Sequence, residues 1–463
     1  MATKTQPTTA PQPKVWRVGT LTYTFAGLVT LFCWLLGGDF AWAMKDRAIS
    51  PAATLLIREF GVSDLVYSLI IIAFPNFTNI FLMPMISYIS DRHRGRFGRR
   101  IPFLAFTTPF IVVGACGLGF SPMLGRWLSG VCGGPEVLSV NLASVICFGL
   151  FWALLDFGQT MAGALSGALV NDVVPQELLG RFYGLFRAIS LLAGMIFNYF
   201  LLGLVEENYM LIFLGVGLFY GLGLLCLCLK VKEGQYPPPV PPAGQKGAML
   251  IFEPILTYFR QNFSVPYYRL VIAALVLATL AAVPFNMFAI LYAKALDVDM
   301  SMYGKVSAVT YGCSFILSFF LGALADRFHP LRTSIAALVL YLGAMIAGWF
   351  CVTGQTSYLV VLFIHSLLSG CYFTVSASLA LRLFPRSLFA QFNSAMSMIL
   401  AISNVLLGPL FGYILDCTNQ NYRIVFLFGV LTTLLGAGSL WLVYRKFLQL
   451  GGDKNYTPPD PGV

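Results

Sequence analysis

Charged side chains are scarce in this chain. Only 10% of the 463 residues are Asp, Glu, Lys or Arg and three are His, whereas 58% are hydrophobic. This composition excludes a soluble protein of two or three domains and indicates a membrane protein. In a soluble chain the net charge of +10 would suggest a nucleic-acid partner. Here the basic residues lie between apolar segments, so loops facing an anionic membrane surface explain them, and we expect no nucleic acid.

The chain also lacks the signatures of metal sites and enzymes. Its ten cysteines have no metal-ligand spacing, and most fall inside apolar segments, where cysteine behaves as a small buried hydrophobe. No Ser/His/Asp set, metal motif or phosphate-binding loop occurs at a suitable spacing. We therefore expect no enzymatic activity, no metal and no cofactor.

Long apolar segments, by contrast, are abundant. A membrane helix needs about 20 predominantly apolar residues, and such segments predict an all-α membrane protein with twelve transmembrane helices in two pseudo-symmetric six-helix halves. The predicted spans lie near residues 21–44, 64–89, 101–120, 140–168, 183–204, 209–230, 267–293, 302–325, 333–353, 357–381, 388–415 and 424–446.

Two features divide the twelve spans into halves of six. Residues 235–245 are proline-rich and cannot be helical, and 249–263 have the apolar spacing of a helix lying on a membrane surface. Asp91-Arg92 ends the second span and Asp326-Arg327 ends the eighth, which indicates a repeat. Such halves are a transporter architecture, with the substrate site between them. The predicted domains are an N-terminal tail (1–20), a first half (21–230), a linker (231–264), a second half (265–446) and a C-terminal tail (447–463).

The most basic segment predicts the orientation. Ser90–Arg100 contains five arginines between two spans, and the positive-inside rule places it in the cytoplasm. Both termini and most of the 29 lysines and arginines then also lie inside. No Asn-x-Ser/Thr sequence falls in a predicted outer loop, which favours a bacterial inner membrane. We expect a monomer.

Two loops resemble those of a known carrier family. Asp91–Arg100 (DRHRGRFGRR), with Ile101–Phe103 after it, is similar to the loop between the second and third spans in the major facilitator superfamily. The form is that of the glycoside–pentoside–hexuronide carriers and the related sucrose transporters. Asn171–Pro175, leading to Gly180–Phe182, is similar as well. The resemblance implies cation-coupled uptake of a sugar or glycoside by alternating access.

The same loops supply candidates for a cytoplasmic gate. Asp91 ends a helix, and in this fold we expect it to accept hydrogen bonds from the N-terminus of the eleventh span. The arginines of the loop are expected to pair with acids of neighbouring loops, and contacts made only in one state bias the equilibrium between states. The alternative is that these arginines serve only topology. The candidate gate residues are Asp91, Arg92, Arg99, Arg100, Asp172, Arg181, Asp326 and Arg327.

Ionisable groups inside the spans are candidates for the transport site, because an ionised side chain at midplane costs roughly 2.5–3.5 kcal/mol or more. Asp156 lies near the middle of the fourth span, on one helical face with Trp152 and Gln159. A sugar needs this mixture of ring, carboxylate and amide. The sucrose-carrier resemblance also implies a coupling carboxylate on this helix. The alternative is a structural aspartate paired with an arginine.

Other candidates are weaker. Asp39 and Trp42 share a face in the outer half of the first span, and we expect Lys45–Arg47 to form local ion pairs at its outer boundary. Arg187 either neutralises Asp156 or binds a sugar, or else reaches the inner surface. Polar residues of the seventh and tenth spans serve either the substrate or helix packing. The candidate substrate- and proton-binding residues are Asp39, Trp42, Trp152, Asp156, Gln159, Arg187, Asn286, His365 and Tyr372.

One departure from the resembled family bears on coupling. Melibiose-type carriers have sodium-binding carboxylates on the second span, whereas this span has Phe74–Asn79 and no acid before Asp91. We therefore expect a proton to be coupled through Asp156 or Asp39. The alternative is uncoupled facilitation. The alternative functions are a carrier of lysophospholipid or another small amphiphile with the same fold, and a non-transporting sugar sensor.

Overall fold

The computed structural model describes residues 15–236, 265–385 and 389–459. Within these residues, twelve helical segments are long and apolar enough to cross a membrane, so the predicted twelve-span fold is confirmed. The predicted surface helix at 249–263 and most of the linker lie outside the described residues.

The first half begins with a feature that the sequence did not predict. Residues β1 (Trp16–Val18) and β2 (Leu21–Tyr23) form an antiparallel hairpin with Trp16 opposite Tyr23, so the predicted tail boundary at residue 20 divides one element. The helices that follow are α1 (Phe25–Glu59), α2 (Asp64–Tyr67), η1 (Ser68–Ala73), α3 (Phe74–Arg92), α4 (Ile101–Val131), α5 (Val140–Val173), α6 (Gln176–Ile196), η2 (Phe197–Leu201), η3 (Leu202–Leu204) and α7 (Tyr209–Lys230).

The second half repeats this plan. Two of its spans are interrupted helices, formed by α9 with α10 and by α13 with α14. Its elements are α9 (Pro266–Leu280), α10 (Val283–Ala295), α11 (Met300–Phe328), α12 (Pro330–Cys351), α13 (Gln355–Ser376), α14 (Leu379–Leu383), α15 (Phe389–Cys417), α16 (Ile424–Gln449) and α17 (Gly452–Asn455).

The first span differs most from its prediction. Helix α1 starts at the N-cap Thr24, whose side chain accepts a hydrogen bond from the Gly27 N–H, and continues to Glu59 rather than ending near residue 44. Charged residues at 45–47 interrupt the apolar run and made the span look shorter. They lie inside the helix, and Lys45 is buried. The prediction that these residues form local ion pairs at an outer boundary is therefore wrong.

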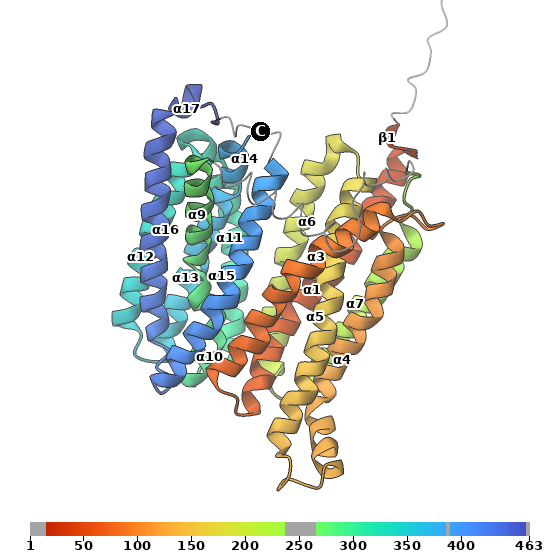
Figure 1. Cartoon of the computed structure of the whole chain (residues 1–463), viewed down its shortest axis with the longest axis vertical. Helices are drawn as coiled ribbons and strands as arrows, with labels where there is room; N and C mark the ends of the chain where they lie inside the picture. Colours follow the sequence, from red (N-terminus) through yellow and green to blue (C-terminus); the bar gives the residue numbers. More distant parts are fainter. Residues whose placement is uncertain (1–14, 237–264, 386–388, 460–463) are drawn as a thin grey trace, which may run out of the picture.

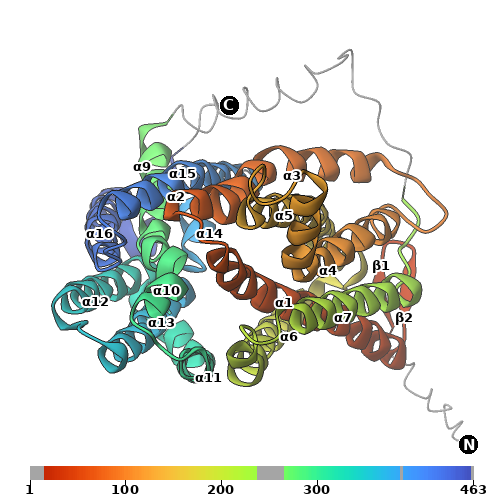
Figure 2. The same ribbon diagram turned by 90° about the horizontal axis from the view of Figure 1, so that it is seen from below.

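The two halves stand side by side (Figure 1, Figure 2). We call the end with the β1–β2 hairpin, the Ser90–Arg100 loop and α17 the tail side, and the other end the opposite side. On the opposite side Lys294 pairs with Glu206 of the other half at 2.6 Å. The Tyr67 hydroxyl donates to the Met287 carbonyl at 3.0 Å. These contacts close the opposite side.

Candidate functional site

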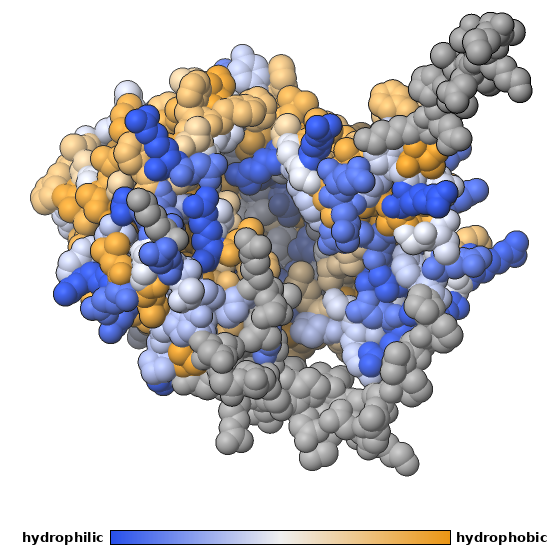
Figure 3. Space-filling view, turned by 90° about the horizontal axis from the view of Figure 1, so that it is seen from above, coloured by the Kyte–Doolittle hydropathy of each residue, from blue (hydrophilic) through white to orange (hydrophobic). Residues whose placement is uncertain are grey.

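A cavity of about 670 Å³ lies between the two halves. Helices α1, α3 and α6 line it from the first half, and α10, α11 and α13 from the second. Seen from the tail side, the molecule is hollowed between the halves, with hydrophilic side chains in the hollow (Figure 3). A compartment between two repeats, open toward one face only, is what alternating access requires.

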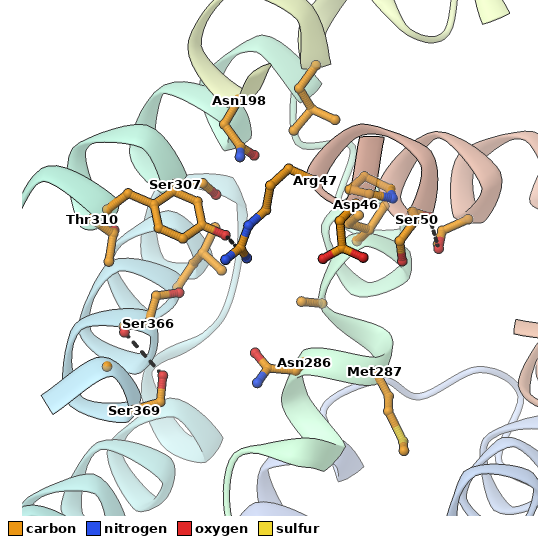
Figure 4. Close-up of a pocket in the computed structure, with 18 of the residues that line it drawn as sticks. Asp46, Arg47, Ser50, Asn198, Asn286, Met287, Ser307, Thr310, Ser366 and Ser369 are labelled. Carbon is orange, nitrogen blue, oxygen red and sulfur yellow. Dashed lines mark hydrogen bonds between the residues drawn. The ribbon is translucent and has the colours of Figure 1, made fainter. Parts of the chain in front are cut away.

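Guanidinium groups dominate the charge of this cavity. Arg47 of α1 points into it (Figure 4), and its NH1 donates to the Tyr311 hydroxyl of α11 at 3.0 Å. Arg187 lines the same space from α6, and Asp46 lies beside Arg47. Neither arginine takes part in an ion pair among the described residues. The further polar lining comprises Ser50, Thr54, Asn76, Ser190, Asn198, Asn286, Ser307, Thr310, Ser314, Ser366 and Ser369.

Asp156 is buried in the first half, outside the lining of the cavity. Its Oδ2 accepts a hydrogen bond from the Thr78 hydroxyl at 2.5 Å, and its Oδ1 accepts one from Gln159 Nε2 at 3.1 Å. Lys45 Nζ donates to Gln159 Oε1 at 2.9 Å and lies 4.2 Å from the centre of the Trp42 ring. The carboxylate and the ammonium are therefore linked through one amide in a buried network.

The predicted sugar-binding face of α5 is packed rather than open. Trp152 is 4% exposed and stacks on Phe148 with ring centres 6.0 Å apart. Helix α5 packs against α3 and α4, so the face with Trp152, Asp156 and Gln159 points into the first half. Helical periodicity predicts that these residues share one face of α5, but it does not predict which helices that face contacts.

Asp39 and Trp42 lie at a second, smaller cavity of about 200 Å³ inside the first half. Asp39 is 8% exposed, and its Oδ2 has no hydrogen-bond partner among the described residues. The other lining is mainly apolar and includes Phe182 and Phe186 of α6. Asp39 and Asp156 therefore occupy separate environments, and within the described ranges Asp156 alone of the two has polar side chains as partners for both oxygens.

In the second half, only one of the predicted site residues lines the central cavity. Asn286 does so, and it is held by His365, whose Nε2 donates to Asn286 Oδ1 at 2.9 Å. The Tyr341 hydroxyl lies 2.8 Å from His365 Nδ1, so both ring nitrogens are engaged. Tyr372 is buried in the packed interior of the second half. His365 thus positions Asn286, whereas Tyr372 does not line the cavity.

The basic loop forms an ion-pair network on the tail side. Arg99 binds Asp172 through two hydrogen bonds, from Nε at 2.9 Å and from NH2 at 2.5 Å. Arg100 reaches Asp172 at 3.3 Å and also pairs with Asp91 and with the Ser90 hydroxyl. The hydrogen bonds with Asp172 raise the pKa of Arg99 above its ordinary value. The network joins the ends of α3 and α5 to the start of α4.

Glu233 completes this network and was not among the gate residues predicted from the sequence. Its carboxylate accepts hydrogen bonds from the backbone N–H groups of Arg99, Arg100 and Ile101 at 2.7 to 2.9 Å. It therefore caps the positive N-terminus of α4. An acid just after the sixth span gave no motif signal, because its partners lie more than 130 residues earlier in the chain.

The other predicted gate residues are placed differently. The Asp91 side chain pairs with Arg99 and Arg100 of its own half, and it has no hydrogen bond or ion pair with the described part of the eleventh span, Phe389–Cys417. Asp326 pairs with Arg382 at 2.7 Å. The Arg92 guanidinium lies 3.5 Å from the centre of the Tyr88 ring, Arg327 lies near the Phe328 ring, and Arg181 is exposed.

Two six-helix repeats with a cavity between them are the architecture of a transporter. The Major Facilitator Superfamily profile matches residues 35–312 and 270–457, and the chain belongs to that superfamily. It is an integral, multi-pass membrane protein whose family and fold are those of transporters rather than enzymes.

Sequence relatives match a short part of the chain. The sucrose transport protein SUT2 of Oryza sativa is 25% identical over 168 residues, which is 34% of this chain and 32% of that protein. The proton-associated sugar transporter A of Homo sapiens is 30% identical over 156 residues, which is 32% of this chain and 19% of that protein. The matched stretch therefore spans about a third or less of these relatives.

Solved structures resemble the whole fold. A D-xylose–proton symporter superposes with a TM-score of 0.61 at 14% identity, covering 95% of this chain and 99% of that chain. A bacterial homologue of the lysosomal transporter Spinster, in an inward-facing and unoccupied conformation, gives a TM-score of 0.63 at 17% identity, covering 93% and 98%. At these identities the likeness shows the fold.

Proposed function

We propose that the protein is a proton-coupled symporter of a sugar or glycoside that works by alternating access. The observation that carries this proposal is a polar cavity between the two repeats that is closed on the opposite side, next to a buried carboxylate network in the first half. The names of the sucrose and proton-associated sugar transporters support the same substrate class.

The lining of the cavity suits a polyhydroxylated substrate. Serine and threonine hydroxyls both donate and accept, amides do the same through two atoms, and guanidinium groups only donate. Sugar hydroxyls need such partners in place of water, because an unpaired buried polar group costs about 1–3 kcal/mol. Arg47 and Tyr311 join the halves across this space at 3.0 Å. A lysophospholipid would need a largely apolar cavity, so this lining speaks against that alternative.

Asp156 is the better of the two carboxylates for proton coupling. Protonation removes its charge while Thr78 and Gln159 still occupy its two oxygens. Lys45 lies close enough to interact with the ionised form, so each protonation changes the balance of charge inside the first half. Such a change can bias the equilibrium between two states only if the states differ in their interaction with that charge. Asp39 Oδ2, by contrast, has no hydrogen-bond partner in the described part of the chain.

The orientation follows from charge. The arginine-rich loop and both described chain ends lie on the tail side, and the positive-inside rule makes that side cytoplasmic. The cavity then faces inward in this structure. A bacterial inner membrane and a monomer remain part of the proposal.

Transport by purified protein in proteoliposomes tests the proposal. Counterflow of a panel of radiolabelled sugars identifies the substrate, and uptake is then measured with an imposed proton gradient, an imposed sodium gradient, or neither. We expect accumulation of one or more sugars only when the proton gradient is present. Counterflow without accumulation under any gradient would contradict coupling, and the absence of counterflow for every sugar would contradict the substrate class.

A further inference from the structure

The smaller cavity, inside the first half, has no part in the proposed transport cycle. It has a volume of about 200 Å³ and is lined by residues of α1, α4, α5, α6 and α7. No described residue lines both this cavity and the central one. Helices α1 and α6 nevertheless contribute to both linings, and they pack against each other (Figure 2). The smaller cavity is therefore a separate compartment beside the central one.

Asp39 is the one carboxylate among the described residues of this mainly apolar lining. It is buried, its Oδ2 has no hydrogen-bond partner in the described part of the chain, and it takes part in none of the ion pairs found there. Lys45 lies further along α1, but its ammonium donates to Gln159. Burying an ionised carboxylate without a partner is strongly unfavourable. The cavity therefore favours a ligand that brings a positive charge to Asp39.

Aromatic rings line the cavity together with Asp39. Trp42 comes from the next turn of α1, and Phe182 and Phe186 come from α6. The Trp42 ring is held in place by Tyr220, whose ring meets it edge to face with the centres 5.9 Å apart. Aromatic faces attract organic cations and also pack against apolar groups. Rings of this kind therefore suit a ligand that is both cationic and largely apolar.

The volume of the cavity limits the ligand to a small molecule. Drug-sized ligands occupy cavities of about 300–1,000 Å³, whereas an apolar cavity of about 150 Å³ holds benzene. A cavity of about 200 Å³ therefore has room for one aromatic ring with a short side chain. Gly167 of α5 also lines the cavity, and a Cβ added at Gly167 meets no described atom within 4 Å. A larger side chain at residue 167 would therefore occupy the space without a clash at its Cβ.

We propose that the smaller cavity is a binding site for a small aromatic amine, with the protonated amine beside Asp39 and the ring among Trp42, Phe182 and Phe186. The carboxylate selects a cation, and the rings supply the apolar contact. Because the two cavities share no described lining residue, the amine does not compete with the transported substrate for the same space. The proposal goes beyond the proposed function, since it requires neither a sugar nor proton coupling.

Binding of phenethylamine, which is protonated at neutral pH, tests this site. Tritiated phenethylamine is titrated onto the purified protein in lipid nanodiscs, and nanodiscs without protein measure its partition into lipid. We expect saturable binding of one amine per protein. Asp39→Asn keeps the size of the side chain and should weaken this binding by at least about tenfold, because a hydrogen bond to a charged group is lost. Phenethyl alcohol and phenylacetate carry the same ring without a positive charge, and both should compete poorly with the amine.

Two further variants locate the site. Gly167→Leu fills the cavity from α5 and keeps the carboxylate, so it should abolish saturable binding. This variant keeps the test valid if Asp39→Asn folds poorly. Glu207→Gln removes an exposed acid of the same half and should leave the affinity for phenethylamine unchanged.

Three results would overturn the proposal. Equal affinity of wild type and Asp39→Asn would show that the carboxylate does not select the ligand. Unchanged binding by Gly167→Leu would place the amine outside this cavity. Stronger competition by phenylacetate than by unlabelled phenethylamine would reverse the charge of the ligand. All of these measurements are made without a sugar or an ion gradient, so failure here is distinguishable from failure of the proposed function.

Discussion

Replacing Asp156 by asparagine should uncouple transport from the proton gradient without stopping it. Asparagine has the size of aspartate and no charge, so it imitates the protonated state. Gln159 keeps an acceptor, and the Thr78 hydroxyl can rotate to accept rather than donate. Lys45 keeps its hydrogen bond to Gln159 at 2.9 Å and its place over the Trp42 ring. The variant should therefore fold and bind substrate.

The size of the effect follows from the single carboxylate in this network. One proton per substrate across a pH step of two units is worth about 2.7 kcal/mol, which corresponds to accumulation of a neutral substrate by about 100-fold. This holds when the membrane potential is clamped at zero. Without a titrating group at residue 156, Asp156→Asn should equilibrate the substrate at a ratio near 1. Counterflow, which needs no proton movement, should continue.

The assay is accumulation in proteoliposomes with an imposed pH step, with counterflow measured on the same preparation. Asp39→Asn is the matched variant, because Asp39 is also a buried carboxylate of the first half but lies at the separate cavity. It should still accumulate substrate. If Asp156→Asn concentrates substrate more than about tenfold under the same step, the reasoning is refuted. If Asp39→Asn alone loses accumulation, the coupling carboxylate is Asp39.

Three further predictions test other parts of the structure. Arg187→Ala removes a cavity cation and should raise the KM for uptake by about tenfold while accumulation persists; a lower maximal accumulation instead would assign Arg187 to coupling. Glu233→Gln weakens the acceptor for three backbone N–H groups of α4 and should lower the melting temperature, whereas Glu207→Gln, on the surface, should not. Burial lowers the pKa of His329, so the folded state favours the neutral imidazole. The melting temperature of the protein should therefore fall as the pH drops below about 6.5. The melting temperature of His329→Asn should fall less over the same range.

The twelve spans and their division into halves could be predicted, because the length and hydropathy of a membrane-spanning segment depend only on its local composition. The arginines of the basic loop were expected to pair with acids of neighbouring loops, because charges of opposite sign in adjacent loops have few other partners. Arg99 and Arg100 do so with Asp172, whereas Arg92 lies over the Tyr88 ring. The role of these residues as a gate stays a prediction. The predicted end of α1 was wrong. Charged residues that face a cavity interrupt an apolar run of sequence in the same way as charged residues at a membrane boundary.

The composition of the cavity could not be predicted, because it depends on which face each helix turns toward the other half. Arg47 was assigned to a boundary, yet it points into the cavity and binds Tyr311 of the second half. The polar face of α5 was assigned to the substrate, yet it packs inside the first half. In both cases the helical periodicity was correct, and the neighbour of the face was decided by contacts between residues far apart in the chain.

On the tail side the ion pairs of the first half are more buried than those of the second half, and this difference indicates which half controls closure. In the first half, Asp172 and Glu233 hold the arginines of the basic loop, and the Arg100 side chain is only 7% exposed. In the second half, the Asp326 side chain of the corresponding pair with Arg382 is 76% exposed. Exposed pairs of this kind contribute about 0–1 kcal/mol. The first half therefore presents a fixed loop with a half-exposed Asp91, and the energy that favours tail-side closure should come from Asp91 rather than from its repeat, Asp326.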